Sequence, residues 1–386
     1  MKLIYCIHSI YNPGGMERVL LNKVKWFVEK KGWEVVIVTT DQHSRPPFYP
    51  FPDSIRMIDL DVNYSDDNGK NVFAKTAGYL RRRSLHKARL TEVLQKEKAD
   101  FVVSLYPSES SFIPDIKDGS KKILELHFCK FFRLQYMRSG LIGMIDRFRT
   151  WQDERIVKRF DKFVVLTEED KENWGPLDNI EVIPNASLAM FDKYSDLSAK
   201  RVIAVGRLDY QKGFDRLVKA WDIVWKTRDF NSWRLDIFGQ GEWQEMLQNM
   251  IDERGLTDCL RLNRPTNDIG KEYAESSLIV MTSNYEGFGM VLVEAMSCGV
   301  PAVAFDCQCG PKDIVRHGER GLVVKNGDIE GLAEAMMKLI RDEELRKRMG
   351  ERAKRVVETY SEERVMGLWE ELFEEISRLD LRSRSK

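Results

Sequence analysis

The chain contains 386 residues, of which 61 are basic and 61 acidic, so its formal net charge is zero. Apolar residues make up 43% and aromatic residues 10%, which is enough for packed cores and argues against a disordered chain. The length predicts two or three domains. No apolar run approaches the roughly 18 residues of a membrane span, and the zero net charge argues against a general nucleic-acid-binding protein.

Short apolar runs alternate with helical patterns along the whole chain. Helical patterns are predicted over Met16–Glu29, Phe214–Lys226 and Glu330–Arg341. Strands with continuous apolar character between helices predict parallel sheets that are covered on both faces. The predicted strands are Leu3–Ile7, Val35–Thr39, Phe101–Leu105, Ile123–Leu126, Phe163–Leu166, Ile180–Ile183, Val202–Val205, Leu235–Phe238, Leu278–Thr282 and Ala302–Phe305.

The alternating series starts twice, because a strand followed by a glycine-containing turn and a helix occurs near residue 3 and again near residue 202. We therefore predict an α/β protein with two Rossmann-like domains facing across a cleft, over residues 1–188 and 189–361. The polar stretch from Pro184 to Lys200 is expected to link them. The tail from Glu343 to Arg378 has an amphipathic helical pattern, and Leu381–Lys386 is expected to fray.

A basic segment interrupts the otherwise even distribution of charge. Residues 70–160 contain 20 basic and 10 acidic side chains. Within this segment, Asn71–Glu97 and Phe128–Phe160 interleave aromatic and apolar residues with cations. Such interleaving suits a membrane surface with anionic headgroups. The alternative is a set of helices that bury their aromatic rings and expose only their charges.

The N-terminal sequence and the cysteines indicate a cytoplasmic protein. The first 15 residues hold one lysine, a short apolar run and no cleavage pattern, so no signal peptide is expected. The chain has no CxxC pair, and Cys307 and Cys309 are too close in sequence for an ordinary disulfide. We expect reduced, mostly buried thiols and no metal site. The six cysteines are Cys6, Cys129, Cys259, Cys298, Cys307 and Cys309.

The first two candidate functional sites follow predicted strands of the first domain. Gly14 and Gly15 let the backbone approach a ligand, and the helix start after them offers free N–H groups to an anion. Glycines that only form a tight turn would give the same pattern. His127 ends the run Lys122–His127, and a histidine at the carboxyl end of a strand is a candidate for catalysis.

The third candidate site combines two cations around one turn. Arg207 and Lys212 lie between the strand that ends at Val205 and the helix that begins at Phe214. A nucleoside diphosphate that leaves a sugar gains negative charge, and a cation about 4 Å away stabilises it by roughly 4 kcal/mol at an effective dielectric constant near 20. Arginine can in addition bind two oxygens at once. The alternative is a solvated loop with ordinary surface charge.

The fourth candidate site is the segment Thr282–Gly299. The N–H groups of Gly289, Met290 and Val291 can hold a phosphate at the helix start, Glu294 can accept two hydroxyls, and Glu286 can face a sugar. Because Glu286 lies in the loop and Glu294 in the helix, the two carboxylates are a poor fit to a glycosidase pair. The alternative is an acidic first turn that suits the helix dipole. The chain lacks GxxxxGK[ST] and a strict GxGxxG, which excludes ordinary P-loop and dinucleotide-binding proteins.

Taken together, these residues resemble the retaining glycosyltransferases of family 4, which have the GT-B fold, over nearly the whole chain. The resemblance rests on the order of the motifs rather than on any one of them. The motifs are Gly14–Arg18, His127, Gly206-Arg207, Lys212-Gly213, Phe238–Gly241, Glu286, Glu294, Gly299–Pro301 and Gly310–Asp313.

The resemblance implies an acceptor-binding first domain, a second domain that binds a nucleotide sugar, and a C-terminal helix, residues 362–386, that crosses back to the first domain. It implies that Arg207 and Lys212 hold the donor diphosphate, Glu294 the ribose, and Glu286 the donor sugar, with His127 near the reacting carbon. Gly15 should border the diphosphate or the acceptor, and Asn263–Pro265 should lie along the base. The expected catalytic residues are His127, Arg207, Lys212 and Glu286. The expected donor-binding residues are Gly14, Gly15, Arg207, Lys212, Gly239, Arg264, Pro265, Glu286, Phe288, Gly289, Met290, Val291 and Glu294.

Two positions depart from the family pattern. Ala186 replaces the usual glycine after Pro184-Asn185, and the segment around Arg264 lacks the common glycine, which affects the expected contacts with the base. The Gly14–Arg18 motif and the basic segment look most like bacterial enzymes that assemble surface polysaccharide on a polyprenyl-diphosphate lipid.

We therefore expect a metal-independent, retaining enzyme without a cofactor that moves a hexose or N-acetylhexosamine from a UDP-sugar to a lipid-linked or oligosaccharide acceptor. We expect it at the inner face of the membrane, as a peripheral protein that binds no nucleic acid. The alternatives are a GT-B nucleotide-sugar epimerase, a soluble sucrose- or glycogen-type synthase, and a non-catalytic protein that binds nucleotide sugars.

Overall fold

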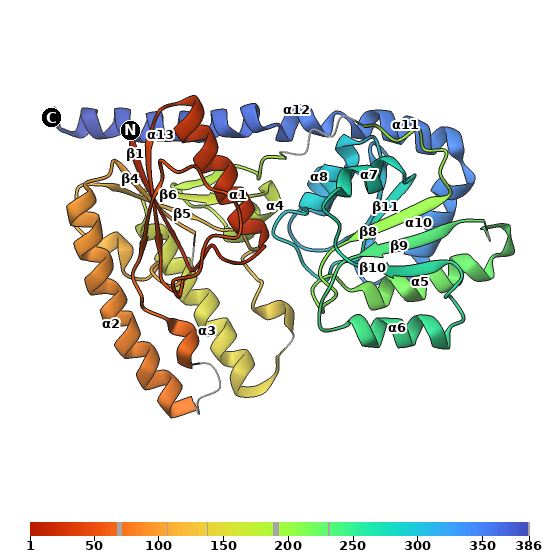
Figure 1. Ribbon diagram of the computed structural model, residues 1–386, viewed down its shortest axis with the longest axis horizontal. Helices are drawn as coiled ribbons and strands as arrows, with labels where there is room; N and C mark the ends of the chain where they lie inside the picture. Colours follow the sequence, from red (N-terminus) through yellow and green to blue (C-terminus); the bar gives the residue numbers. More distant parts are fainter. Residues whose placement is uncertain (68–71, 106, 137, 188–192, 231, 385–386) are drawn as a thin grey trace.

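The computed structural model describes residues 1–67, 72–105, 107–136, 138–187, 193–230 and 232–384. Figure 1 shows two lobes side by side, each built around one parallel sheet, with a series of C-terminal helices running along both. We refer to the lobe that contains the N-terminal sheet as the first lobe and to the other as the second lobe. The boundary expected between residues 188 and 189 falls within 188–192, outside the described residues.

The first lobe contains a seven-stranded sheet in the order β3-β2-β1-β4-β5-β6-β7, with every neighbouring pair parallel. The strands carry continuous apolar runs because both faces of the sheet are covered. The strands are β1 (Lys2–Ile7), β2 (Glu34–Thr39), β3 (Arg56–Asp59), β4 (Phe101–Ser104), β5 (Lys121–Glu125), β6 (Lys162–Val165) and β7 (Ile180–Val182). The helices are α1 (Gly15–Lys25), continued by a π-helical turn over Trp26–Lys30, α2 (Val72–Glu97), α3 (Gly140–Ile156) and α4 (Glu168–Trp174).

The second lobe contains a six-stranded parallel sheet in the order β10-β9-β8-β11-β12-β13. The strands are β8 (Arg201–Val205), β9 (Arg234–Phe238), β10 (Leu260–Asn263), β11 (Leu278–Met281), β12 (Ala302–Asp306) and β13 (Gly321–Lys325). The helices are α5 (Phe214–Lys226), α6 (Gln244–Glu253), α7 (Ile269–Ala274), α8 (Met290–Ser297), α9 (Pro311–Val315), α10 (Ile329–Arg341) and α11 (Glu343–Ala353). Single turns of 3₁₀ helix lie at Tyr64–Asp67, Ile113–Asp115, Leu134–Tyr136, Val157–Arg159 and Arg228–Phe230.

The C-terminal tail forms three helices rather than one. After α11, the short helix α12 (Val356–Tyr360) leads into α13 (Glu362–Arg384), which runs along the first lobe in Figure 1. Trp369 and Phe373 of α13 share one buried cluster with Tyr5 of β1 and Phe101 of β4. The tail therefore supplies part of the hydrophobic core of the first lobe.

All ten predicted strands are present, with ends that differ by one or two residues. Three further strands, β3, β10 and β13, were not predicted, and all three lie at sheet edges. An edge strand is partly solvated, and polar side chains interrupt the apolar run in β3 (RMID) and β10 (LRLN). β13 (GLVVK) contains a short apolar run, which the prediction missed. The helix predicted over Phe214–Lys226 has the predicted ends. The helix predicted over Met16–Glu29 begins at Gly15, and its α-helical part ends at Lys25. A π-helical turn extends it to Lys30.

Candidate functional site

The two sheets each have one place where the strand order reverses along the sheet. In the first lobe β1 and β4 flank this place, and in the second lobe β8 and β11 flank it. A crevice forms beyond the carboxyl ends of such strands, and ligands of parallel α/β sheets bind there. Three of the four expected catalytic residues follow β8 or β11, whereas His127 follows β5 of the opposite lobe.

Lys212 and Glu286 form the centre of the candidate site in the second lobe. Nζ of Lys212, in the loop after β8, lies 2.6 Å from Oε1 of Glu286, in the loop after β11. Oγ of Ser283 donates a hydrogen bond of 2.5 Å to the same oxygen. Both charged side chains are largely buried, with 16% and 7% of their surface exposed. The structure therefore holds a cation and a carboxylate, which the sequence separates by 74 residues, in one fixed pair.

Arg207 lies in the same loop as Lys212 but faces solvent. Its side chain is 69% exposed, and its guanidinium lies 3.2 Å from the carboxylate of Asp209. It also donates a hydrogen bond of 2.7 Å to Oε1 of Gln211. The loop holds Arg207 by weak, solvated contacts, which leaves its position easier to adjust than that of Lys212.

The start of α8 lies in the loop that carries Glu286. Gly289 precedes the helix with φ of 99°, a left-handed conformation that favours glycine, and no side chain caps the helix start. The first N–H groups of α8, at Met290 and Val291, are of the kind that bind phosphate. Phe288 is one of the expected donor-binding residues, but its side chain is buried and packs against the ring of Tyr360. Only the backbone of Phe288 can face a ligand.

Glu294 lies one turn into α8 and accepts a hydrogen bond of 3.2 Å from the hydroxyl of Tyr273. Burial raises the pKa of Glu294, and the positive charge of Arg18 acts in the opposite direction. Arg18 belongs to α1 of the first lobe, so a charge of the first lobe acts on a carboxylate of the second. The sequence analysis included Arg18 in the Gly14–Arg18 motif and assigned it no function.

The remaining expected donor-binding residues of the second lobe lie along the same edge of the sheet. Gly239 follows β9 and packs against the loop after β8, where a β-carbon would lie 1.9 Å from the carbonyl oxygen of Gly206. Arg264 and Pro265 follow β10, the edge strand, and both are exposed. The structure thus brings the expected residues of the second lobe to one edge, with Arg264 and Pro265 at its outer end.

His127 meets this edge from the first lobe. It lies two residues beyond β5, with 7% of its side chain exposed. A β-carbon on Gly287 would lie 2.1 Å from the carbonyl oxygen of His127, so the two loops touch and only glycine fits at position 287. Further contacts join the lobes nearby, including a hydrogen bond of 2.8 Å from Gln135 to Gln308. His127 and Glu286 therefore lie in segments that are in direct contact.

Glu125 and Lys23, which the sequence analysis did not single out, lie behind His127. Oε1 of Glu125 lies 3.2 Å from Nε2 of His127 and also forms an ion pair with Nζ of Lys23. The ammonium group of Lys23 in turn lies 3.9 Å from the ring centroid of Trp369 of α13. Glu125 and His127 are two residues apart, a spacing that places both on one side of an extended chain and could have identified the pair.

A carboxylate lies at the start of α1. We expected its free N–H groups to receive an anion near Gly14 and Gly15. Instead the carboxylate of Glu17 turns back over this position, so that a β-carbon on Gly14 would lie 2.0 Å from Oε2 of Glu17. Burial raises the pKa of Glu17. In this conformation the Glu17 side chain occupies the space in front of the start of α1, and a diphosphate that binds there would have to displace it.

The six cysteines are free and buried, as expected. Sγ of Cys309 lies 3.3 Å from Oδ1 of Asp170, which is a further contact between the lobes. In the described part of the chain, no group of three or more His, Cys, Asp or Glu side chains is placed to hold a metal ion. Nor does any described helix combine the length and apolar character needed to cross a membrane.

Comparison with protein families gives two matches that together span most of the chain. Residues 13–186 match the family described as "Glycosyltransferase Family 4", and residues 189–356 match the family described as "Glycosyl transferases group 1". The first match contains the segment with Gly14 and His127. The second contains Arg207, Lys212, Glu286 and Glu294.

Among curated relatives, an uncharacterized glycosyltransferase of Haemophilus influenzae is 28% identical over 375 residues, which cover 95% of this chain and 98% of that protein. The amylovoran biosynthesis glycosyltransferase AmsD of Erwinia amylovora is 36% identical over 222 residues. These residues cover 55% of this chain and 62% of AmsD.

Solved structures with the same fold cover nearly the whole chain. Sucrose-phosphate synthase from Thermosynechococcus elongatus superposes with a TM-score of 0.79 and 18% identity, over 98% of this chain and all of that chain. Anabaena HepE in complex with UDP-glucose superposes with a TM-score of 0.73 and 17% identity, over 97% of this chain and all of that chain. At these identities the likeness concerns the fold, which is GT-B.

Proposed function

This chain belongs to glycosyltransferase family 4 and has the GT-B fold, and we propose that it transfers a hexose or N-acetylhexosamine from a UDP-sugar to a saccharide acceptor on polyprenyl diphosphate, in bacterial polysaccharide synthesis. The observation that carries this proposal is the convergence of Lys212, Glu286 and the start of α8 at one crevice, opposite His127. The relation to AmsD supports polysaccharide synthesis, and the UDP-glucose complex of HepE supports a UDP-sugar donor.

The geometry supports a reaction driven by electrostatic stabilisation of the leaving group. The sugar–phosphate bond breaks, and the electron pair stays on the diphosphate, whose added charge Lys212, Arg207 and the α8 N–H groups would stabilise. The acceptor hydroxyl oxygen bonds to the anomeric carbon on the face from which the diphosphate leaves, and the hydroxyl proton passes to the departing diphosphate oxygen, so the anomeric configuration is retained. In this proposal Glu286 and His127 contact the sugar, Glu294 binds the ribose, and the first lobe binds the acceptor. No step requires a metal ion or a cofactor.

The pairing of Lys212 with Glu286 gives the lysine a defined position before the donor binds. Glu286 neutralises part of the charge of Lys212 before the donor binds. The diphosphate therefore binds to a lysine that is already paired with a carboxylate and held in position. The cation stabilises the diphosphate most when the added charge appears, which favours the transition state over the bound substrate. We therefore assign catalysis to the pair rather than to either residue alone.

The test is UDP release from a panel of UDP-sugars, with and without a synthetic polyprenyl-diphosphate sugar. We expect Lys212→Ala and Glu286→Ala each to lower turnover by about 10²–10³-fold or more, because each removes a preorganised group from the charged site. Lys219→Ala is the matched control, since Lys219 is a lysine of α5 whose side chain is 42% exposed and forms an ion pair with Asp215, at 3.5 Å. Circular dichroism confirms that each variant is folded.

Different outcomes identify the competing functions. Wild-type rates in both site variants would remove the proposed mechanism. Conversion of the UDP-sugar to an epimer without an acceptor would indicate an epimerase, and transfer only to a soluble sugar would indicate a soluble synthase. Tight UDP binding without any turnover would indicate a non-catalytic binding protein.

The membrane part of the proposal rests on exposed apolar side chains of α3. Met144, Phe148 and Trp151 expose 64%, 54% and 43% of their surface, and Ile142 and Ile145 are also exposed. Arg147 and Arg149 lie on the same helix and are exposed. Large apolar side chains beside arginines match a helix that enters the headgroup region of an anionic membrane. This observation favours the membrane surface over helices that bury all their aromatic rings.

Co-sedimentation with vesicles tests this surface. We expect binding to vesicles with anionic lipids to fall by about tenfold or more in Arg147→Glu/Arg149→Glu, because each basic residue near the surface contributes about 1 kcal/mol. Lys325→Glu/Lys338→Glu makes the same charge change on the second lobe and serves as the control. Binding that is insensitive to salt and to the α3 reversal would exclude an electrostatic membrane surface.

A further inference from the structure

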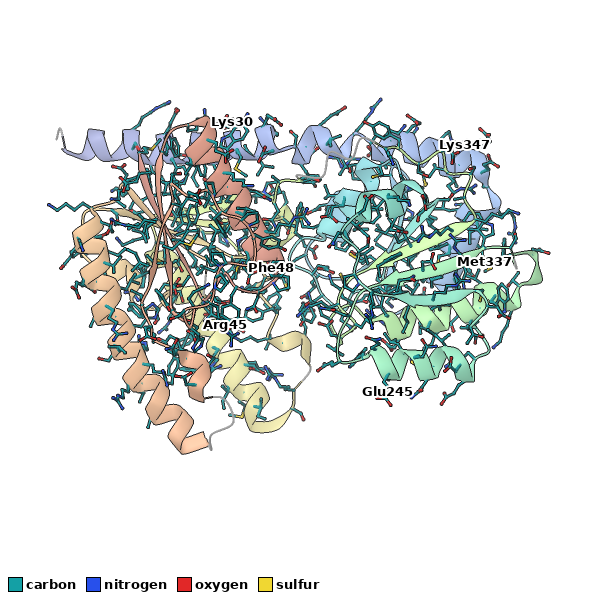
Figure 2. All side chains as sticks on the ribbon, viewed as in Figure 1. Lys30, Arg45, Phe48, Glu245, Met337 and Lys347 are labelled. Carbon is teal, nitrogen blue, oxygen red and sulfur yellow. The ribbon has the colours of Figure 1, made fainter. Side chains whose placement is uncertain are left out.

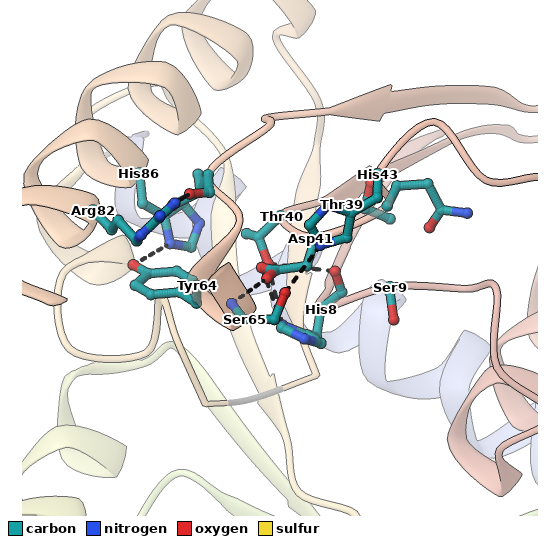
Figure 3. A network of polar contacts seen from close by, with 12 residues as sticks. His8, Ser9, Thr39, Thr40, Asp41, His43, Tyr64, Ser65, Arg82 and His86 are labelled. Carbon is teal, nitrogen blue, oxygen red and sulfur yellow. Dashed lines mark hydrogen bonds and ion pairs between the residues drawn. The ribbon is translucent and has the colours of Figure 1, made fainter. Parts of the chain in front are cut away.

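A histidine–aspartate pair lies at the carboxyl edge of the first sheet, outside the residues assigned so far. His8 directly follows β1 and Asp41 follows β2 by two residues. Nδ1 of His8 lies 3.4 Å from Oδ2 of Asp41 (Figure 3). The pair therefore lies next to the place where the strand order of the first sheet reverses, between β1 and β4.

The environment of Asp41 fixes the carboxylate toward His8. Asp41 is completely buried, and its Oδ1 accepts a hydrogen bond of 2.9 Å from the backbone N–H of Ser65. Its Oδ2 accepts no hydrogen bond from any described residue. A buried carboxylate oxygen without a hydrogen-bond donor is costly, and the adjacent imidazole is the group positioned to offset that cost.

The backbone holds His8 in the same position. Its carbonyl oxygen accepts hydrogen bonds from the N–H groups of Thr40 and Asp41, at 3.1 and 3.0 Å. Nδ1 faces two oxygens at 3.4 Å, one of the Asp41 carboxylate and one of the Thr40 hydroxyl, which itself donates to the carbonyl oxygen of His8 at 3.3 Å. Two oxygens that can accept a hydrogen bond favour the imidazole tautomer with the proton on Nδ1. Nε2 is then a hydrogen-bond acceptor, and it contacts no described hydrogen-bond partner. Because 42% of the His8 side chain is exposed, the imidazole is accessible to a ligand.

The other histidines of this network are engaged by their own partners (Figure 3). Nε2 of His43 lies 2.9 Å from Oγ of Ser65, and Nδ1 of His86 lies 3.1 Å from the hydroxyl of Tyr64. His86 is buried, and burial lowers its pKa to about 4. These contacts account for His43 and His86 as structural groups. They leave His8 as the histidine of the network that combines exposure with a fixed orientation.

The position of His8 relative to His127 matches the size of a sugar. Strand β5, which His127 follows, is separated from β1 only by β4. Neighbouring strands lie about 4.8 Å apart, so the ends of β1 and β5 are separated by roughly 10 Å. One or two sugar rings span such a gap. A saccharide that reaches the reacting carbon near His127 can therefore contact His8 with another part of its structure.

An exposed aromatic ring lies beside the pair. Phe48 is 55% exposed, and its backbone N–H donates to the carbonyl oxygen of Ile10, two residues after His8. Figure 2 shows Phe48 on the side of the first lobe that is nearer to the second lobe. Arg45, also labelled there, lies 4.6 Å from the ring centroid of Tyr11. A polar acceptor beside an exposed apolar ring is a combination that binds molecules with both hydroxyl groups and apolar faces.

We propose that His8, oriented by Asp41, binds a hydroxyl group of the acceptor saccharide. This inference rests on the proposed function and assigns the acceptor side of the same reaction. His8 accepts a hydrogen bond from the hydroxyl and takes no part in breaking the donor bond. Asp41 is a positioning residue that acts through His8.

Steady-state kinetics with farnesyl-diphosphate-linked glucose, galactose and N-acetylglucosamine test the proposal. We expect His8→Ala to raise the KM for the acceptor by about five- to tenfold, the loss of one hydrogen bond. The KM for the UDP-sugar and the rate of its hydrolysis without acceptor should stay at the wild-type values. Asp41→Asn should give a similar but smaller change, because it keeps the side-chain volume and removes the charge that fixes the tautomer. His317→Ala, in the second lobe, is the matched control.

A second measurement does not depend on turnover. The ¹⁵N resonances of His8, assigned by comparison with His8→Ala, should show a protonated Nδ1 and should shift when one of the three farnesyl saccharides is added. Equal acceptor KM values in wild type and His8→Ala, or His8 resonances that none of the saccharides shifts, would overturn the proposal. A wild-type protein that neither hydrolyses nor transfers any UDP-sugar would instead overturn the proposed function itself.

Discussion

Oε1 of Glu125 lies 3.2 Å from Nε2 of His127, and both side chains are almost completely buried. The same oxygen is paired with Lys23 of α1, so one carboxylate joins a helix to the loop that faces the second lobe. A loop residue that is held by a buried charge keeps its orientation when substrate binds. Glu125 is therefore placed to orient His127, and Lys23 is placed to orient Glu125.

The first prediction concerns turnover. Glu125→Gln should lower kcat for sugar transfer by about 10²-fold, because a displacement of a positioned group by about 1 Å has an effect of this size. The affinity for UDP should not change, since UDP contacts are proposed only in the second lobe. Glu125→Asp should restore part of the activity. Glu334→Gln, an exposed change on α10, should have wild-type kinetics, and a wild-type kcat in Glu125→Gln would exclude the positioning effect.

The second prediction concerns stability. Lys23→Met should lower the free energy of unfolding by about 3–5 kcal/mol, because it leaves a buried carboxylate without its partner. The double variant Lys23→Met/Glu125→Gln should lose less than the sum of the two single variants, because it removes both charges. Urea unfolding of the four proteins measures this difference. If the losses of unfolding free energy in the two single variants add up to the loss in the double variant, Lys23 and Glu125 have no coupling free energy.

The third prediction concerns acid. Burial by itself would raise the pKa of Glu125, but the charges of Lys23 and His127 outweigh it and lower the pKa to about 2. A carboxyl group whose pKa is lower in the folded state contributes stability above its unfolded pKa, near 4.5, and this contribution is lost as the pH falls toward 2. Between about pH 6, above the unfolded pKa, and about pH 3, below it, urea unfolding should show a smaller loss of stability in Lys23→Met/Glu125→Gln than in wild type. Equal losses would contradict the assignment.

The fourth prediction concerns the contact between the lobes. In Gly287→Ala a β-carbon would lie 2.1 Å from the carbonyl oxygen of His127, so the observed contact cannot form. We expect a loss of transfer activity of about 10²-fold with UDP affinity within a few-fold of wild type, because the donor residues of the second lobe remain in place. Gly367→Ala, on α13, where nothing lies within 4 Å of an added β-carbon, controls for the loss of a glycine. Normal transfer by Gly287→Ala would show that catalysis does not need this contact.

The sequence predicted the central strands of both sheets because those strands are buried on both faces and carry uninterrupted apolar runs. It did not predict β3, β10 and β13, whose exposed positions hold residues such as Arg56 and Arg261. The amphipathic pattern of the tail was continuous, whereas the structure divides it into α11, α12 and α13. An amphipathic pattern indicates which residues face a hydrophobic core. It does not indicate that the chain leaves the core of the second lobe and enters the core of the first.

The site was predictable where a motif places a side chain at the end of a strand, as for Lys212 and Glu286. Their pairing at 2.6 Å was not, because it joins loops that follow two different strands. Lys23 was overlooked for a related reason. It is a lysine on an apolar helix face, and only its burial beside Glu125 and Trp369 shows that it does not reach solvent. The carboxylate of Glu17 over Gly14 also depends on a side-chain conformation that no motif specifies.

The placement of Trp369 in the core of the first lobe has a consequence for biosynthesis. A ribosome makes the strands of this lobe first and Trp369, Phe373 and Ile376 near the end, after the whole second lobe. At about 5–20 residues per second, roughly 10–40 seconds separate the last strand of the first lobe from the helix that covers it. During this interval one apolar sheet face of the nascent chain is covered only by the α1 segment, whose Leu20, Val24 and Phe27 belong to the same cluster, and incompletely covered apolar surface of this kind is what chaperones shield.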